Sequence, residues 1–289
     1  MPSNKSVLIL GGRGNLGVQL AKVFANSLVW GRDDLDVTDF SLLRVKISEM
    51  ADQLTLVINC VAYNDVDGAE SNQETAHLLN AQLPGQLAKI GRDLNLPLLH
   101  YSTGYVFSGR KNFYVESDSP NPISVYGASK AEGEKNIQAQ TEKFYIVRTN
   151  ILFGPPGLSA AAKPSVVDIM KDRGLKEGRL KGVTDEFASF TYTPDLARAT
   201  FNLVSGQYAY GIYHLTNEGF GSWFNLAQEI FNILQAPIVI TPVLAKDFKR
   251  KALRPRHSVL QNTKLPRLRT WPEALCDYLK PGLISGLTN

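Results

Sequence analysis

The amino-acid sequence predicts an α/β fold, with a doubly wound parallel sheet and a smaller C-terminal lobe. Short apolar runs without alternation recur along the first 155 residues, and such runs are typical of strands buried on both faces. Helical segments separate these runs, which is the rhythm of βαβ units. Beyond about residue 155 the rhythm is lost, so we expect most of the remaining chain to form a different lobe.

The composition is that of an ordinary soluble globular protein. Of 289 residues, 44% are hydrophobic and 20% are charged, and the net charge is +4. Basic residues are scattered apart from one cluster at 246–256, so we expect no nucleic-acid partner. The N-terminus lacks a signal-peptide pattern, and no apolar run approaches the roughly 20 residues that span a bilayer. These features predict a cytoplasmic protein without a membrane partner, as a monomer or homodimer.

Only two cysteines, Cys60 and Cys276, are present. They form neither a disulfide framework nor a metal-ligand spacing, which fits a reducing compartment. We therefore predict no metal site.

The first predicted strand, SVLIL, leads into the glycine turn GGRGNLG and directly on into a helix. Gly11 permits the tight turn, Gly14 lets the backbone approach a pyrophosphate, and Gly17 lets the helix pack closely. The N–H groups at the helix start, around Asn15 and Leu16, would face the phosphates. The strand–turn–helix context gives this spacing its meaning, and it predicts a dinucleotide cofactor.

The second predicted strand, SLVW, bears on the choice of cofactor. An acidic residue just after it would hold the ribose diol of NAD, but the first polar side chain is Arg32, which suits a 2′-phosphate. This favours NADPH, while Asp33 and Asp34 leave NADH open. Asp39 and Phe40 lie where the loop could reach the adenine.

The third predicted strand, TLVINC, ends where ligands of open parallel sheets bind, beyond the carboxyl ends of the strands. We expect Cys60 to be a small buried residue without a redox role. The residues predicted to border the cofactor here are Cys60, Val61, Ala62 and Tyr63.

An amphipathic helix follows, AHLLNAQLPGQLAKIGRDLN, with a kink expected at Pro84. Asn80 lies among apolar neighbours on it. It either joins a buried hydrogen-bond relay behind a catalytic lysine or caps a local irregularity, and the spacing leaves both readings open.

The stretch from His100 to Lys130 carries the candidate catalytic residues. Tyr126 and Lys130 are four residues apart on a predicted helix and so share one face. A nearby ammonium favours the phenolate and would lower the pKa of the tyrosine. The Thr103 hydroxyl, at the end of a strand, could bind the same reacting oxygen. Together these three groups suit the reduction of a ketone.

Another buried strand, KFYIVRTNILFG, completes the alternation. We therefore predict a dinucleotide-binding domain of the Rossmann type over residues 1–155, completed by about 190–217. Residues 156–289 are expected to form mostly a substrate-binding lobe.

Eight stretches in order, from residue 7 to about 265, carry a resemblance to a known family. The chain resembles an extended short-chain dehydrogenase/reductase and, within that group, the dTDP-4-dehydrorhamnose reductase family. The stretches are GGRGNLG, LDVTDF, NCVAYNDVDGAES, LLNAQ, HYSTGYVFSG, SVYGASKAEGEK, VRTNILFG and LRPRHSVLQNTKL.

The resemblance implies reduction of the C4 ketone of a nucleotide-linked deoxysugar by NADPH or NADH, in polysaccharide or other deoxysugar biosynthesis. It implies that Thr103 and Tyr126 bind the ketone oxygen, that Tyr126 donates the proton, and that Lys130 holds the nicotinamide ribose. Arg254 and Arg256 could bind the diphosphate of the substrate, since guanidinium groups make bidentate contacts with phosphate. The further candidates for the substrate side are Ser102, Gly104, Tyr105, Asn150 and Ile151.

Three departures from the family pattern fall on the sugar side. Gly104 stands where the family usually has aspartate, and Ile151 stands where it usually has tryptophan. The loop DEFASFTYTPDLA matches its family counterpart poorly around 187–191.

The sequence excludes one other function of the superfamily, a dehydratase, and leaves two more open. A sugar-nucleotide dehydratase needs an Asp-Glu pair after the catalytic threonine, where this chain has Gly104 and Tyr105, so that reading fails. An epimerase shares the catalytic triad and stays open. A non-catalytic NADP-binding regulatory subunit, resembling that of methionine adenosyltransferase, also stays open, because it would tolerate an altered sugar site.

Overall fold

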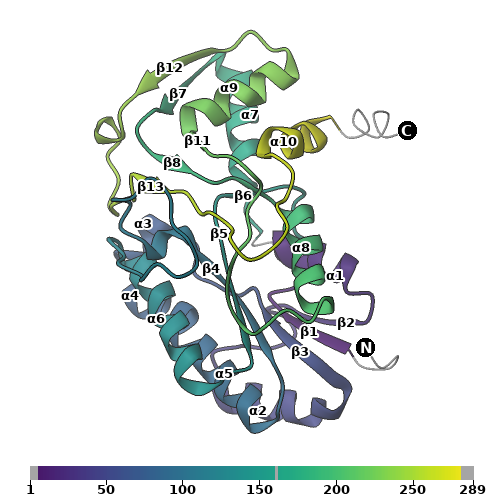
Figure 1. The fold of residues 1–289 in the computed structure, drawn as a ribbon. Coiled ribbons are helices and arrows are strands. Elements are labelled where there is room, and N and C mark those ends of the chain that lie inside the picture. The colour runs from purple at the N-terminus through teal and green to yellow at the C-terminus, as the bar shows by residue number, and fades with distance from the viewer. Residues whose placement is uncertain (1–5, 160–161, 281–289) are drawn as a thin grey trace.

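The computed structural model describes residues 6–159 and 162–280, and its centre is a six-stranded parallel sheet. The strand order is β10-β5-β4-β3-β1-β2, and each neighbouring pair is parallel. The predicted doubly wound α/β fold is therefore confirmed (Figure 1). The strands are β1 Ser6–Leu10, β2 Ser27–Trp30, β3 Leu54–Asn59, β4 Leu98–Thr103, β5 Phe144–Thr149 and β10 Gly211–His214.

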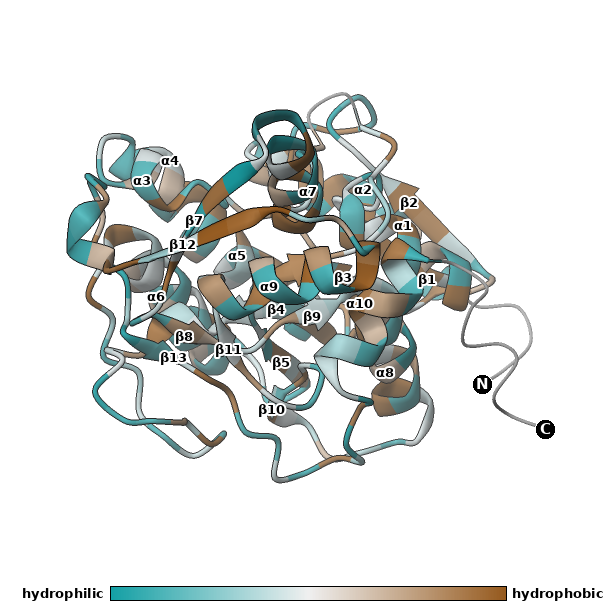
Figure 2. Ribbon diagram, turned by 90° about the horizontal axis from the view of Figure 1, so that it is seen from above, coloured by the Kyte–Doolittle hydropathy of each residue, from teal (hydrophilic) through white to brown (hydrophobic). Residues whose placement is uncertain are grey.

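Helices cover both faces of this sheet, because its apolar strands have no side that tolerates water. On one face, α1 (Asn15–Val23) and α8 (Thr193–Ser205) pack against each other and the strands. On the other lie α2 (Phe40–Glu49), α5 (Leu83–Asp93) and α6 (Val125–Gln140). Seen from above, brown hydrophobic ribbon follows the strands, while teal gathers in outer loops (Figure 2). None of the helices in the described ranges is long and apolar enough to cross a membrane.

The helical segment before β4 is irregular one turn earlier than the sequence suggested. α3 (Val66–Ala69) and α4 (Gln73–His77) lead into a π-helical turn, Leu78–Gln82, and α5 then begins with Pro84 in its first turn. A proline is tolerated there because its missing N–H is not needed, so the expected kink at Pro84 gives way to a π-turn around Asn80.

The smaller lobe has its own apolar core, which includes Phe190, Leu226, Ile230 and Trp271. Its elements stand above the sheet in Figure 1. The helices are α7 Val166–Glu177, α9 Trp223–Leu234 and α10 Trp271–Leu279. Short strands form small sheets: β7 Arg179–Val183 with β12 Val239–Val243, β6 Leu152–Phe153 with β9 Thr191–Tyr192, and β8 Phe187–Ala188 between β11 Gly221–Ser222 and β13 His257–Ser258.

The strand order reverses between β1 and β3, because the chain winds from β1 to β2 in one direction and from β3 to β10 in the other. In open parallel sheets a crevice forms outside the carboxyl ends of the strands at such a reversal, and ligands bind in it. The glycine turn after β1 and the segments after β3 and β4 meet at this edge.

Candidate active site

The glycine turn has the close contacts that its spacing predicted. Gly11 has φ +71°, and a Cβ there would lie 3.1 Å from the backbone of Cys60 and Val61. A Cβ on Gly17 would lie 2.4 Å from the Cα of Gly12, so α1 can pack here only without a side chain. Gly14 is the N-cap of α1, and a Cβ there would meet only one backbone oxygen, at 3.3 Å. Gly14 therefore has room on the side where a phosphate would approach.

The side chains of Asn15 and Leu16 serve the scaffold. Asn15 accepts a hydrogen bond from Gly157 N (2.9 Å) and donates one to the Lys163 carbonyl (3.0 Å), which fixes the segment after β6 against the glycine turn. Leu16 is buried in the apolar core beside α8. At these two positions only the backbone N–H groups are suited to a phosphate.

Arg13 is a candidate that the sequence reading missed. Its guanidinium pairs with Asp33 (2.8 Å) and Asp34 (3.0 Å), and its side chain lies against Gly31. Arg13 therefore engages both carboxylates that left NADH open, and together with the exposed Arg32 it balances their charge at the expected ribose site. The sequence did contain a signal for this role, because Arg13 is the one charged residue within the glycine motif GGRGNLG.

Asp39 and Phe40 have structural roles at the start of α2. The Asp39 carboxylate caps the helix by accepting from Leu42 N (2.9 Å), and Phe40 packs half-buried against the core. These contacts do not by themselves place either residue at an adenine.

The segment after β3 is held by Asn80, which decides between the two readings of that residue. Asn80 Oδ1 accepts from Tyr63 N (2.8 Å), and its Nδ2 donates to the Tyr63 carbonyl (3.2 Å) and to Ser129 Oγ (3.0 Å). From the π-turn, Asn80 thus holds the backbone after β3 and links it to α6 through Ser129, and its hydrogen bonds do not include Lys130. Cys60, Val61, Ala62 and Tyr63 are half-buried along this edge. Burial raises the pKa of the Cys60 thiol, which stays uncharged.

Thr103 and Tyr126 come together at the carboxyl end of β4. The Thr103 hydroxyl accepts from Tyr105 N (3.2 Å), and it lies close enough to the Tyr126 phenol to act on the pKa of that group. The Tyr126 ring meets the Tyr105 ring edge-on, with 6.0 Å between centroids. The two hydroxyls can therefore reach one substrate oxygen.

The expected pKa of Tyr126 was wrong in sign. Burial raises the pKa of Tyr126 above its ordinary value, the Thr103 hydrogen bond opposes this shift, and Lys130 makes no resolved contribution. Desolvation disfavours the phenolate more than the neighbouring donor favours it. Tyr126 is therefore a phenol at neutral pH, the form that a proton donor needs.

Lys130 is buried behind these two residues, 2% exposed. Its ammonium nitrogen lies 2.6 Å from the Tyr101 carbonyl oxygen and 3.1 Å from His100 Nε2. Burial lowers the pKa of Lys130 to about 8, against opposing effects of Glu134 and Cys60. His100 was not among the predicted site residues.

Ser102 does not fit the predicted sugar contact. Its hydroxyl donates to buried Glu134 at 2.5 Å, and Glu134 is in turn ion-paired with Arg148 at 2.6 Å. Successive residues of a strand point to opposite faces, so Ser102 faces α6 and the core.

Gly104 and Asn150 meet the C-terminal part of the chain. Asn150 Nδ2 donates to the carbonyl (2.7 Å) and the hydroxyl (2.8 Å) of Ser258 in β13. A Cβ on Gly104 would lie 2.8 Å from that same carbonyl and 2.9 Å from Asn150 Nδ2. The aspartate usual at this position has no room here, which is a physical reason for the departure.

Ile151 follows with a strained backbone. Its φ of +24° lies in the region that β-branched residues avoid. The Ile151 carbonyl accepts from Thr191 N (3.0 Å), so the conformation is fixed where β6 and β9 pair. Such strain persists only when the surrounding structure holds it.

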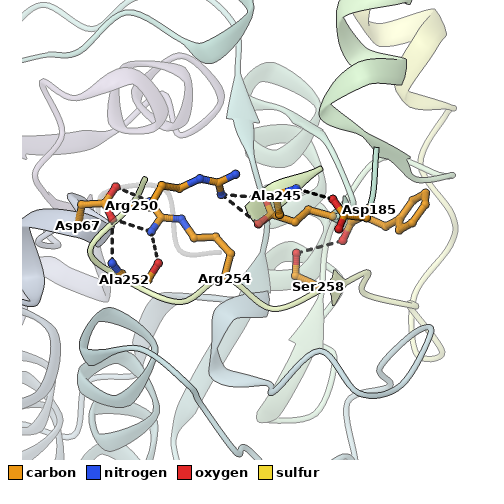
Figure 3. A network of polar contacts seen from close by, with 9 residues as sticks. Asp67, Asp185, Ala245, Arg250, Ala252, Arg254 and Ser258 are labelled. Carbon is orange, nitrogen blue, oxygen red and sulfur yellow. Dashed lines mark hydrogen bonds and ion pairs between the residues drawn. The ribbon is translucent and has the colours of Figure 1, made fainter. Parts of the chain in front are cut away.

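We call residues 245–256 the strap, because they join the sheet domain to the smaller lobe (Figure 3). Arg254 makes a bidentate ion pair with Asp67 (2.8 and 2.7 Å), and Ala252 N donates to the same carboxylate (2.9 Å). A single guanidinium nitrogen of Arg250, Nη1, donates to both carboxylate oxygens of Glu186 in the lobe (3.0 and 2.8 Å). The Arg254 pair lowers the pKa of Asp67 to about 2.

The strap contributes a different arginine pair from the predicted one. Arg254 and Arg250 both act to lower the pKa of Tyr105, whose ring contacts that of Tyr126, so both positive charges lie near the candidate active site. Arg256 is exposed, and its carbonyl accepts from Phe187 N (2.8 Å). Arg250 escaped the sequence reading because it lies within a run of basic residues with no distinguishing spacing.

Comparisons with known proteins agree with this geometry. The family model described as the RmlD substrate binding domain matches residues 5–283. A dTDP-4-dehydrorhamnose reductase of Streptomyces griseus is 34% identical, over 93% of this chain and 91% of the relative. The Bacillus subtilis spore coat polysaccharide biosynthesis protein SpsK is 30% identical, over 95% and 96%.

Solved structures give the same relationship. A dTDP-4-dehydrorhamnose reductase from Clostridium acetobutylicum aligns with a TM-score of 0.88 at 33% identity, over 95% of this chain and 98% of that one. The Bacillus anthracis enzyme, in complex with NADP, aligns with a TM-score of 0.88 at 30% identity, over the same shares. A UDP-glucose 4-epimerase from Thermotoga maritima, at 18% identity and a TM-score of 0.77, shares the fold. The chain therefore belongs to the RmlD family, as the resemblance predicted.

Proposed function

We propose that this protein is an NADPH-dependent reductase of the C4 ketone of a nucleotide-linked deoxysugar, with dTDP-4-dehydrorhamnose as the first candidate substrate. The observation that carries the proposal is that Thr103 and Tyr126 come together at the carboxyl end of β4, where Thr103 acts on the pKa of the Tyr126 phenol, with Lys130 buried behind them. The relatives named as dTDP-4-dehydrorhamnose reductases support it. The name of SpsK supports a role in polysaccharide biosynthesis.

The residues at the β1–β3 crevice fit a bound dinucleotide. The turn through Gly11 and Gly17 leaves no space for side chains, and α1 begins at Gly14 without a side-chain cap. Arg13, which already engages Asp33 and Asp34, and Arg32 place two guanidinium groups at the expected ribose, and such groups suit the 2′-phosphate of NADPH. The Bacillus anthracis relative in complex with NADP supports the same choice. When bound, this cofactor supplies the hydride.

The catalytic residues bind the ketone oxygen and transfer the proton to it. Thr103 donates a hydrogen bond to the ketone oxygen, and Tyr126 transfers its phenolic proton to that oxygen as negative charge develops. The raised pKa of Tyr126 keeps this proton in place at neutral pH. Lys130 lies one helical turn further along α6, where it can compensate the charge of a phenolate.

The strap offers two guanidinium groups to the diphosphate of the substrate. Both arginines are held by carboxylates. The oxygens of Asp67 occupy the bidentate positions on Arg254 that phosphate oxygens would take, whereas Arg250 engages Glu186 through Nη1 alone. We propose Arg254 and Arg250 as the principal diphosphate ligands and Arg256 as an outer one. Cytoplasmic location and oligomeric state, monomer or homodimer, stay predictions from the sequence.

A non-catalytic regulatory subunit is the second candidate, and the altered sugar side favours it. β13 fills the space where the family has an aspartate at Gly104, and Ile151 replaces an aromatic side chain. The intact contact of Thr103 with Tyr126 favours catalysis. The two candidates predict opposite results for turnover.

The deciding experiment follows the absorbance of NADPH after the purified protein is mixed with dTDP-4-dehydro-6-deoxy-L-mannose. We expect oxidation that requires both protein and sugar. Tyr126→Phe keeps the ring that packs on Tyr105, but it should lower kcat by roughly 10²–10⁴-fold, the usual contribution of a positioned proton donor. Its affinity for NADPH, measured by fluorescence, should be unchanged. Tight NADPH binding without oxidation, across a panel of 4-keto nucleotide sugars, would establish the regulatory alternative instead.

A further inference from the structure

A chain of three buried polar side chains runs behind the catalytic pair, from Asn59 through His100 to Lys130. Asn59 Nδ2 lies 3.1 Å from His100 Nδ1, and His100 Nε2 lies 3.1 Å from Lys130 Nζ. Asn59 and His100 are completely buried, and Lys130 is 2% exposed. Because these three side chains are buried from solvent, every donor in this series of hydrogen bonds must face an acceptor.

The direction of the hydrogen bonds is set at one end by the backbone. Asn59 Oδ1 accepts from Val61 N (3.0 Å), and a backbone N–H can only donate. The amide NH₂ of Asn59 must therefore face His100 Nδ1, which has to accept. A neutral imidazole carries one hydrogen, so that hydrogen lies on Nε2. An imidazolium is excluded at this site, because burial holds the pKa of His100 well below its ordinary value.

The Nε2–H of His100 consequently points at Lys130 Nζ. An ammonium has three N–H donors and no lone pair, so a protonated Lys130 would set two donors against each other at 3.1 Å. A neutral amine can accept from Nε2–H while it donates to the Tyr101 carbonyl, 2.6 Å away. Every hydrogen bond in this series is satisfied only with Lys130 in the amine form, so the series disfavours the ammonium and acts in the same direction as burial on the pKa of Lys130.

The other titratable groups around Lys130 do not reverse this preference. Cys60 and Glu134 favour the ammonium. The Cys60 thiol is uncharged because burial raises its pKa, and the Glu134 carboxylate is already engaged by Arg148 at 2.9 and 2.6 Å. The phenol of Tyr126, on the same helix, is uncharged at neutral pH.

We propose that Asn59 and His100 are positioning residues that set the protonation state of Lys130, by presenting a hydrogen-bond donor to its amine. Lys130 is then not a permanent cation. The ammonium of Lys130 is present below its lowered pKa and lost above it, so the positive charge that compensates a Tyr126 phenolate is available only up to mildly alkaline pH. This catalytic role rests on the proposed function, whereas the tautomer of His100 is a property of the chain alone.

The tautomer can be observed directly by nitrogen-15 NMR of the uniformly labelled full-length protein. The chain has four histidines, and a His100→Gln variant identifies the signal of His100 by its loss. We expect the Nε2–H tautomer for His100, unchanged throughout a titration across neutral pH. An Nδ1–H tautomer or an imidazolium would overturn the proposal. Neither outcome depends on finding the sugar substrate.

Asn59→Asp tests the link to Lys130. Its carboxylate keeps an oxygen for Val61 N–H but replaces the NH₂ with an acceptor, so His100 should move its hydrogen to Nδ1 and turn a lone pair towards Lys130. The ammonium is then favoured. We expect the His100 signal to change tautomer and the alkaline limb of the pH profile of NADPH-dependent reduction to move to higher pH, by about one unit or more.

The matched control is Asn80→Asp, another carboxylate at a fully buried asparagine, which contacts Tyr63 and Ser129. It should leave the tautomer of His100 and the alkaline limb where they are. A folded Asn59→Asp protein with an unchanged tautomer would contradict the proposal. Absence of turnover in the wild type would remove the pH profile and count against the proposed function, while the NMR result would still decide the tautomer.

Discussion

The two sides of the crevice are constructed differently. The cofactor side is made by backbone, from a glycine turn and a helix N-terminus within a few residues of each other. The sugar side is made by side chains from segments far apart in sequence, as in the Asp67–Arg254 pair, 187 residues apart, and the Asn150–Ser258 contact, 108 apart. Local spacing specifies the first kind of site, whereas the second exists only after the lobe and the sheet have packed together.

The largest effect is expected from two glycines of the cofactor side. Gly17→Ala would place a Cβ 2.4 Å from the Cα of Gly12, and backbone cannot yield cheaply. Overpacking of this kind costs about 1–3 kcal/mol or more, so we expect both a lower Tm and NADPH binding weaker by roughly tenfold to a hundredfold.

Gly14→Ala is the matched variant, because its Cβ would meet only one oxygen at 3.3 Å. It should fold with a Tm close to that of the wild type and still weaken NADPH binding. Thermal unfolding and fluorescence titration measure the two properties separately. If Gly14→Ala binds NADPH normally, the pyrophosphate does not approach at this residue.

On the sugar side, the strap arginines should differ from each other. Arg254→Gln removes a half-buried guanidinium near Tyr105, whereas Arg256→Gln changes an exposed one. A charge-assisted hydrogen bond to phosphate is worth about 1.5–3 kcal/mol, so we expect the KM for the nucleotide sugar to rise roughly tenfold or more in Arg254→Gln. Arg256→Gln should change it much less.

Steady-state kinetics with each substrate varied in turn separate this effect from general damage. The KM for NADPH should be unchanged in both arginine variants, since neither residue lies at the glycine turn. Equal effects of the two variants on the sugar KM would restore the original prediction that Arg254 and Arg256 act as a pair.

The same contrast explains what the sequence could predict. The glycine turn, the parallel sheet and the shared face of Tyr126 and Lys130 follow from short-range periodicity, and the structure shows each. The pKa of Tyr126 did not follow, because an i, i+4 spacing gives a common face but not the depth of burial. Arg250 and Asp67 were missed because their partners, Glu186 and Arg254, are 64 and 187 residues away in the sequence, so no local pattern marks either pair.

Gly104 offers a stability test of the sugar side. Gly104→Ala would place a Cβ 2.8 Å from the Ser258 carbonyl and 2.9 Å from Asn150 Nδ2. β13 would have to move, and we expect a loss of about 1–3 kcal/mol in the free energy of unfolding. Denaturant unfolding measures it. An Ala variant as stable as the wild type would show that β13 can withdraw, and that an aspartate would be admitted here.

The smallest effect concerns the acid stability conferred by the strap. The folded-state pKa of Asp67 is lowered from 3.8 to about 2, so the unfolded state binds more protons between these values. The ion pair with Arg254 therefore contributes its full stability above about pH 4, and this contribution is lost as the pH falls towards 2. Asp67→Asn should be less stable than the wild type near neutral pH, and the two proteins should converge in acid.

The side chain of Asp67 is 39% exposed, so solvent screens the pair, and we expect a difference of only about 0.2–1 kcal/mol that shrinks with added salt. Urea unfolding at low ionic strength, repeated across the acid range, can resolve it. A difference that persists unchanged at low pH would mean that Asp67 stabilises the strap through its hydrogen bond to Ala252 N and not through its charge. In that case breaking the ion pair between Arg254 and Asp67 would cost little free energy. The substrate diphosphate could then replace the Asp67 carboxylate on Arg254 more readily than the geometry of the pair suggests.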